Sequence, residues 1–178
     1  MRYCNGHNYE SIGIIGSFRK QMDAIAHAKD VFEKNGFKVL APKTTTITGS
    51  NEIAFVLLET DKDESPRILE KNYLKALLAS DAVFVCNTNG YIGASAMFEL
   101  GYLISKGQEV FFLEEPLEPL ISSLIHYKYM IGTPEKVCNY LKETNKLWNS
   151  RDWFDKDHER KADFTFDDRQ YADHLELD

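Results

Sequence analysis

Residues 82–113, AVFVCNTNGYIGASAMFELGYLISKGQEVFFL, decide the fold class of this chain. Ala82–Cys86 is apolar throughout, residues 93–106 repeat apolar side chains at helical spacing, and residues 109–113 are a second apolar run. This pattern predicts a strand, a helix and a strand, because strands without polar alternation are buried on both faces. The segment is therefore predicted to be one unit of a parallel sheet covered by helices.

Strand and helix signals continue to alternate on both sides of this unit. Strands are predicted over residues 11–15 and 37–40, and helices over 19–35, 66–80 and 133–147. We therefore expect an α/β fold with a parallel sheet and helices on both of its faces. In such sheets, ligands bind beyond the carboxyl ends of the strands.

Length and charge divide the chain into a body and a tail. The 178 residues include 21 Lys and Arg against 28 Asp and Glu, for a net charge of −7, and 43% of residues are hydrophobic. We expect one α/β domain over residues 1–150, followed by an acidic C-terminal arm over residues 151–178. The arm has ten acidic, five basic and five aromatic residues, and is therefore predicted to pack on its own body or on a neighbouring subunit.

Composition also excludes several classes of protein. An acidic chain lacks the clustered Lys and Arg that binding to a nucleic-acid polymer needs. No apolar run approaches the roughly 18–20 residues that span a bilayer, and the first residues lack the apolar core of a secretory signal. The three cysteines are widely spaced and form no CxxC motif, so we expect reduced thiols and no metal site. These features predict a cytoplasmic protein that does not bind membranes.

The turn after the first predicted strand, residues 16–20 (GSFRK), is a candidate anion site. Gly16 and Ser17 offer backbone N–H groups and a hydroxyl at the start of a helix, and Arg19 adds a guanidinium suited to phosphate. The alternative interpretation is that Ser17 only caps the helix and that Arg19 is solvated. The turn matches neither GxGxxG nor GxxxxGK[ST], so dinucleotide and P-loop binding have little support.

The loop after the third predicted strand leads into a helix that carries a candidate nucleophile. Glu99 lies one turn beyond Ser95 on the same face of this helix. We expect the helix dipole to help keep Glu99 ionised, and an ionised, partly desolvated carboxylate is a competent nucleophile for an anomeric carbon. The alternative interpretation is an ordinary surface glutamate.

Together the two loops resemble a known family. Residues 89–116, NGYIGASAMFELGYLISKGQEVFFLEEP, and the upstream GSFRK turn are similar to the nucleoside 2-deoxyribosyltransferase superfamily, which includes 2′-deoxynucleoside 5′-monophosphate N-glycosidases. The shared order is a Gly-rich turn, a small residue, Glu-Leu-Gly, a helix, a Gly and an apolar strand. The resemblance covers residues 11–116, extends more weakly to about residue 148, and is absent from the arm.

This resemblance implies a flavodoxin-like or Rossmann-like fold, no cofactor and a homo-oligomer. It also implies cleavage or exchange of the N-glycosidic bond of a (deoxy)nucleoside or its 5′-monophosphate, with Glu99 as the nucleophile. Substrate-binding roles are implied for Gly16, Ser17, Arg19, Asn87, Gly90, Tyr91, Gly93 and Ser95. Of these, Ser17, Arg19 and Ser95 match phosphate-binding positions, which favours a monophosphate.

One departure from the family pattern leaves an alternative function open. Family members carry an Asp on the helix before the third strand, where this chain has Asn72 or Tyr73. Glu70, Asp61 or Asp63 are candidate substitutes for it. Without a substitute, a non-catalytic nucleotide-binding or sensor module of the same fold is the alternative, and an interaction protein that acts through the arm is a third. The sequence leaves hydrolase and transferase equally open.

Overall fold

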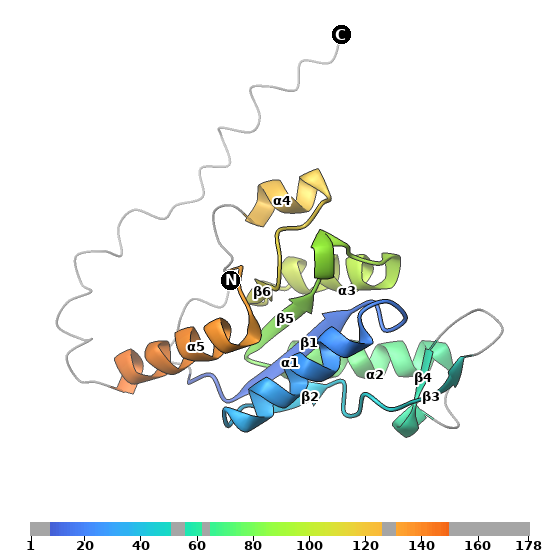
Figure 1. Cartoon of the computed structure of the whole chain (residues 1–178), viewed down its shortest axis with the longest axis horizontal. Helices are drawn as coiled ribbons and strands as arrows, with labels where there is room; N and C mark the ends of the chain where they lie inside the picture. The colour runs from blue at the N-terminus through green and yellow to red at the C-terminus, as the bar shows by residue number, and fades with distance from the viewer. Residues whose placement is uncertain (1–7, 51–55, 62–64, 126–130, 150–178) are drawn as a thin grey trace, which may run out of the picture.

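The computed structural model describes residues 8–50, 56–61, 65–125 and 131–149 of the chain (Figure 1). Its strands and helices are β1 (Ser11–Gly16), α1 (Met22–Lys34), β2 (Lys38–Ala41), β3 (Ile47–Ser50), β4 (Val56–Leu58), η1 (Glu59–Asp61), α2 (Pro66–Ala79), β5 (Ala82–Cys86), η2 (Thr88–Gly90), α3 (Ala94–Ser105), β6 (Val110–Phe112), α4 (Pro119–Ile125) and α5 (Pro134–Asn149). Four strands form a sheet in the order β2-β1-β5-β6, with every neighbouring pair parallel. The predicted parallel α/β fold is confirmed.

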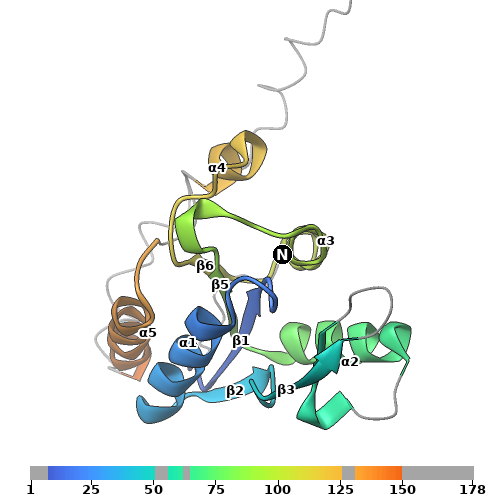
Figure 2. The same ribbon diagram turned by 45° about the vertical axis from the view of Figure 1, so that its right-hand side comes forward.

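Helices cover both faces of this sheet and enclose two hydrophobic cores (Figure 2). On one face, α1 and α5 pack on strand residues that include Phe84 and Phe111. On the other face, α2 and α3 pack on the alternate residues of the same strands, among them Val85 and Phe112. All four of these strand side chains are fully buried, which explains why the strands show no polar alternation.

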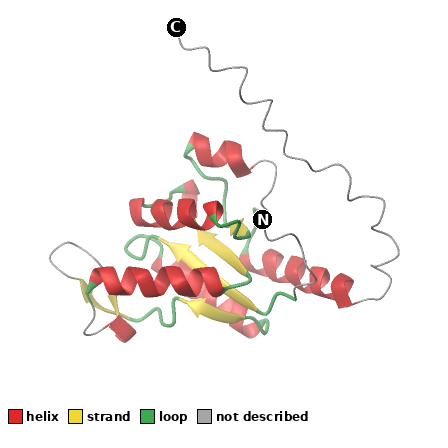
Figure 3. Ribbon diagram, turned by 180° about the vertical axis from the view of Figure 1, so that it is seen from behind, coloured by secondary structure: helices red, strands yellow, loops and turns green. Residues whose placement is uncertain are grey.

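The region between β2 and α2 departs from expectation, because it contains an antiparallel hairpin of β3 and β4. The hairpin lies apart from the four-stranded sheet, at the side of α2 (Figures 1 and 3). Its sequence is polar around a short apolar patch, and Ile47 is 47% exposed, so no buried alternation marks these strands. Helix α4 was not predicted either. It begins at Pro119, directly after a loop that contains Pro116, and closely spaced prolines are more typical of a loop than of a helix.

Helix α1 begins later than the predicted start at residue 19. The backbone N–H groups of Lys20 and Gln21 both donate to the Ser17 carbonyl, at 2.9 and 2.8 Å, and form a separate turn before the helix. Gln21 is the N-cap residue, so the interpretation of Ser17 as the cap is wrong.

None of the helices described is long and apolar enough to cross a membrane. The acidic arm over residues 151–178 lies outside the described residues.

Candidate functional site

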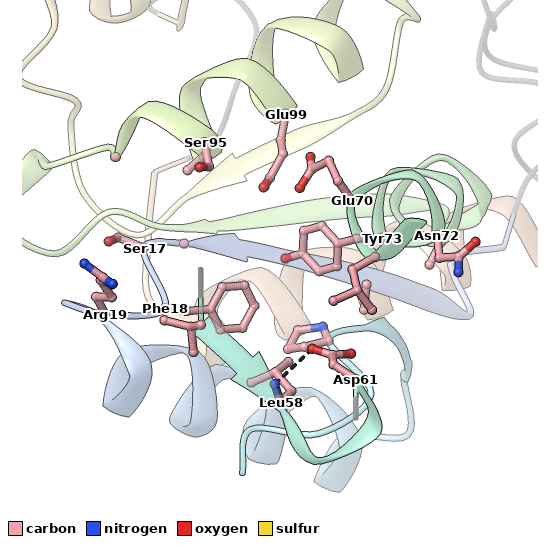
Figure 4. Close-up of a pocket in the computed structure, with 18 of the residues that line it drawn as sticks. Ser17, Phe18, Arg19, Leu58, Asp61, Glu70, Asn72, Tyr73, Ser95 and Glu99 are labelled. Atoms are coloured by element: carbon pink, nitrogen blue, oxygen red, sulfur yellow. Dashed lines mark hydrogen bonds between the residues drawn. The ribbon is translucent and has the colours of Figure 1, made fainter. Parts of the chain in front are cut away.

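A cavity of about 580 Å³ opens at the carboxyl ends of β1 and β2. Its walls come from the loops after these two strands, the β4–η1 segment, α2, and the loop that leads into α3. Figure 4 shows the side chains that converge on it from these segments. This is the edge at which parallel sheets bind ligands, as the strand pattern predicts.

Most of the candidate site residues line this one cavity. Those that do are Gly16, Ser17, Arg19, Asp61, Glu70, Tyr91, Gly93, Ser95 and Glu99. Segments far apart in sequence are brought together because β1 and β5 are adjacent strands whose carboxyl ends lie at one edge. Asn87 and Gly90 do not line the cavity. Asp63 lies outside the described residues.

The side chain of Asn87 ties two strand ends together instead of facing the cavity. Asn87 is fully buried, its Nδ2 donates to the Glu114 carbonyl at 2.5 Å, and its Oδ1 accepts from the Glu114 N–H at 3.0 Å. Gly90 has a φ of +70°, and a Cβ there would lie 2.6 Å from the Glu115 carbonyl oxygen. Both residues therefore join the loop after β5 to the segment after β6.

Glu99 is the most deeply buried carboxylate of the cavity. It is 5% exposed, and its Oε2 has no hydrogen-bond partner within the described part of the chain. Burial, and secondarily the charge of Glu70, raises the pKa of Glu99 to about 9. The expectation that the helix dipole keeps Glu99 ionised is therefore wrong, because desolvation outweighs the dipole.

Glu70 is the carboxylate that faces Glu99. It extends from α2 toward α3, and the two carboxyl groups are turned toward each other (Figure 4). Burial also raises the pKa of Glu70, and its Oε1 is buried without a partner among the described residues. Carboxyl groups that face each other are coupled in their titration, because the charge of one disfavours ionisation of the other.

Asp61 is the less suitable substitute for the missing helix aspartate. Its Oδ2 accepts the backbone N–H of Leu58 at 2.9 Å, so its carboxylate fixes the turn after β4. Figure 4 places Asp61 on the far wall from Glu99, whereas Glu70 lies beside Glu99. The geometry thus favours Glu70 among the candidates that the structure describes.

The other end of the cavity carries groups suited to an anion. Ser17, Arg19 and Ser95 lie there (Figure 4), next to the start of α3, where the N-cap Gly93 has no side chain to occupy the first amides. Arg19 is exposed and has no ion-pair partner in the described ranges. A phosphate or carboxylate group fits this end, because helix N-termini and guanidinium groups both favour negative charge.

Another part of the cavity wall is apolar, and no sequence motif marks it. It consists of Phe18, Leu40, Pro42, Val56, Leu58 and Leu69. The rings of Phe18 and Tyr73 meet edge to face at 6.0 Å, and the Tyr73 hydroxyl donates to the Ile14 carbonyl. Phe18 could have been suspected from its place beside Ser17. Val56 and Leu58 reach the cavity through a hairpin that no sequence signal marked.

No known protein family and no curated protein sequence matches the chain. Within the described ranges, no group of three or more His, Cys, Asp or Glu residues could hold a metal ion. Among solved structures, the chain is similar to the Clostridium botulinum CMP N-glycosidase BcmB, with 16% sequence identity, a TM-score of 0.46, and coverage of 77% of this chain and 98% of that chain.

Proposed function

We propose that this protein cleaves or exchanges the N-glycosidic bond of a (deoxy)nucleoside 5′-monophosphate, with Glu99 as the nucleophile. The observation that carries the proposal is the pair of buried Glu99 and half-buried Glu70, whose carboxyl groups face each other, each with one buried oxygen that has no partner among the described residues, in a cavity whose other end suits an anion. Buried polar atoms without partners cost stability, so such a pair is typical of a functional site.

The cavity accommodates a mononucleotide in one orientation. The 5′-phosphate lies between Ser17, Arg19 and Ser95, where the start of α3 favours negative charge. The sugar then lies over Glu99, and the base lies toward the apolar wall that Phe18 and Leu58 help to form. In this orientation the phosphate meets the anion-binding groups, the sugar meets Glu99 and the base meets the apolar wall.

The two carboxyl groups supply the two functions that the reaction needs, a nucleophile and a general acid. The reaction needs Glu99 ionised and Glu70 protonated, so the proton that the raised pKa keeps on Glu99 first passes to Glu70. The Glu99 carboxylate attacks C1′ and forms an ester, while the C1′–N bond breaks and the base leaves with its electron pair and the proton from Glu70. Water or a second base then attacks C1′, releases Glu99, and returns a proton to Glu70.

A chromatographic assay of base release tests this function directly. The wild-type protein, Glu99→Gln and Glu70→Gln are incubated with a panel of nucleosides and 5′-monophosphates, with and without an added acceptor base. We expect Glu99→Gln to lower kcat by at least about 10³-fold and Glu70→Gln by about 10²–10⁴-fold. Glu143→Gln, on the exposed side of α5, is the matched control. A new nucleoside identifies a transferase, whereas free sugar phosphate identifies a hydrolase.

The second candidate is a non-catalytic nucleotide-binding or sensor module. The observation in its favour is the raised pKa of Glu99, about 9, which leaves this carboxyl mainly protonated at neutral pH. A sensor binds nucleotides but releases no base from any member of the panel, and Glu99→Gln leaves its affinity nearly unchanged. Absence of base release in every reaction would contradict the enzymatic proposal and support this one.

A further inference from the structure

We infer that Gln21 is a positioning residue of this site, an inference that rests on the proposed function. Gln21 is 5% exposed and is not among the residues that line the cavity. Its Oε1 accepts the backbone N–H of Ser17 at 2.8 Å, and its Nε2 donates to the backbone carbonyl of Tyr91 at 2.9 Å. One buried amide therefore joins the turn after β1 to the loop before α3.

The chemistry of the two partners explains why a glutamine occupies this position. The Ser17 N–H can only donate and the Tyr91 carbonyl can only accept, so the bridging side chain must carry both an acceptor and a donor. The amide of glutamine does so without charge. A glutamate would keep the acceptor but place a carboxylate oxygen against the Tyr91 carbonyl, and a methionine would leave both backbone groups unpaired.

The bridge determines where the anion-binding groups lie. Ser17 and Gly93 come from the two joined segments, and a Cβ on Gly93 would lie 3.4 Å from the Ser17 Cβ, in ordinary contact. The same segments meet again at the surface, where the Lys20 ammonium lies 4.2 Å from the centre of the Tyr91 ring. This second link is exposed and therefore weaker than the buried amide bridge.

The bridge also occupies one donor of the anion-binding turn. Because the Ser17 N–H is bonded to Gln21, the turn offers an anion the Ser17 hydroxyl, together with the amides of Phe18 and Arg19, which have no acceptor in the part of the chain described. Gln21 thus acts on a phosphate through the conformation of this turn and not by contact. Its loss is expected to weaken recognition of the 5′-phosphate more than that of the nucleoside.

The experiment compares wild type with Gln21→Met and Gln21→Glu. We expect Gln21→Met to lower the ratio of kcat/KM for a 5′-monophosphate over its nucleoside by about ten-fold or more, since small displacements of positioning groups have large effects. By NMR, exchange of the Ser17 amide with solvent is expected to speed up in Gln21→Met and to stay slow in Gln21→Glu, which keeps the acceptor. Titration with inorganic phosphate should shift the Phe18 and Arg19 amide signals more weakly in Gln21→Met.

Asn35→Ala supplies the matched control at the opposite end of α1. The half-buried Asn35 side chain also makes two hydrogen bonds, to the Val31 carbonyl at 2.9 Å and from Lys142 at 2.7 Å. We expect Asn35→Ala to lower Tm without changing the ratio of kcat/KM for a 5′-monophosphate over its nucleoside. If Gln21→Met leaves either the kcat/KM ratio or the exchange rate of the Ser17 amide unchanged, Gln21 does not have this role. The same conclusion follows if inorganic phosphate does not shift the Phe18 and Arg19 amide signals of the wild-type protein. If the wild type cleaves nothing, the proposed function fails, and the exchange and phosphate measurements still decide the role of Gln21.

Discussion

At the scale of single residues, Glu99 links function to stability through its raised pKa. Its pKa of about 9 lies above the ordinary value of 4.5, so between these values the folded protein holds a proton that the unfolded chain releases. The free energy of unfolding therefore falls as pH rises through this window, at a limit of about 1.4 kcal/mol per pH unit for one proton. Glu99→Gln removes the titration. We expect it to raise Tm at pH 8 by on the order of 10 °C and to change Tm little at pH 5.

Calorimetry at several pH values checks this expectation. Glu143→Gln, which removes an exposed carboxylate from α5, should follow the wild-type curve at each pH. Parallel curves for wild type and Glu99→Gln would show that Glu99 is not the buried titrating group.

The same scale shows which site residues a sequence can and cannot reveal. Glu99, Ser17 and Arg19 were predicted because each lies within a short local motif beside a strand end. Asn87 also directly follows a strand, but its side-chain amide is hydrogen-bonded to the backbone of Glu114. Glu114 lies near Asn87 because β5 pairs with β6, which no local sequence pattern reveals. Gln21, in contrast, was not predicted, although it joins two segments of the proposed site. Its partner carbonyl belongs to Tyr91, 70 positions along the chain, so no local pattern marks it.

At the scale of elements, the predicted strands and helices are those that bury a regular face. The four sheet strands and the helices α1, α2, α3 and α5 all contribute buried residues to the two cores, and all were predicted with small shifts at their ends. The β3–β4 hairpin and α4 were missed because both are short and largely exposed. The hairpin nevertheless supplies Val56 and Leu58 to the cavity, so part of the proposed base site was not predictable.

Gly90 tests how firmly the loop after β5 is held. Its φ is +70°, and a Cβ would lie 2.6 Å from the Glu115 carbonyl and 2.9 Å from the Leu117 Cγ. Gly107 has a similar φ of +73°, but a Cβ there would meet nothing within 4 Å. We expect Gly107→Ala to cost about 1 kcal/mol from backbone strain alone, and Gly90→Ala about 2–4 kcal/mol, because the loop must also shift.

Denaturant unfolding of the two alanine variants gives this difference directly. The midpoint of Gly90→Ala should be clearly lower than that of Gly107→Ala, with the same slope m. Equal losses would mean that the segment at Glu115 and Leu117 yields without cost and does not hold the loop.

At the scale of the whole molecule, helices on both faces of the sheet cover the two hydrophobic cores, and we expect the body to fold without the arm. A chain that ends at residue 150 loses ten acidic and five basic residues, so its net charge changes from −7 to −2. We expect its Tm to stay within about 2 °C of the full chain, since the two cores are formed by β1, β2, β5, β6 and the helices that pack on them. We also expect its kcat for base release to be unchanged, because the carboxyl pair and the anion-binding end lie in the body.

Sedimentation equilibrium and the base-release assay, applied to both chains, separate the possible roles of the arm. If the arm docks on a neighbouring subunit, the shortened chain forms assemblies of fewer subunits at the same concentration but has the same kcat. If the arm packs on its own body, the number of subunits and kcat both persist. A fall in kcat/KM at unchanged Tm would contradict the division proposed here, because it would mean that residues 151–178 complete the substrate site.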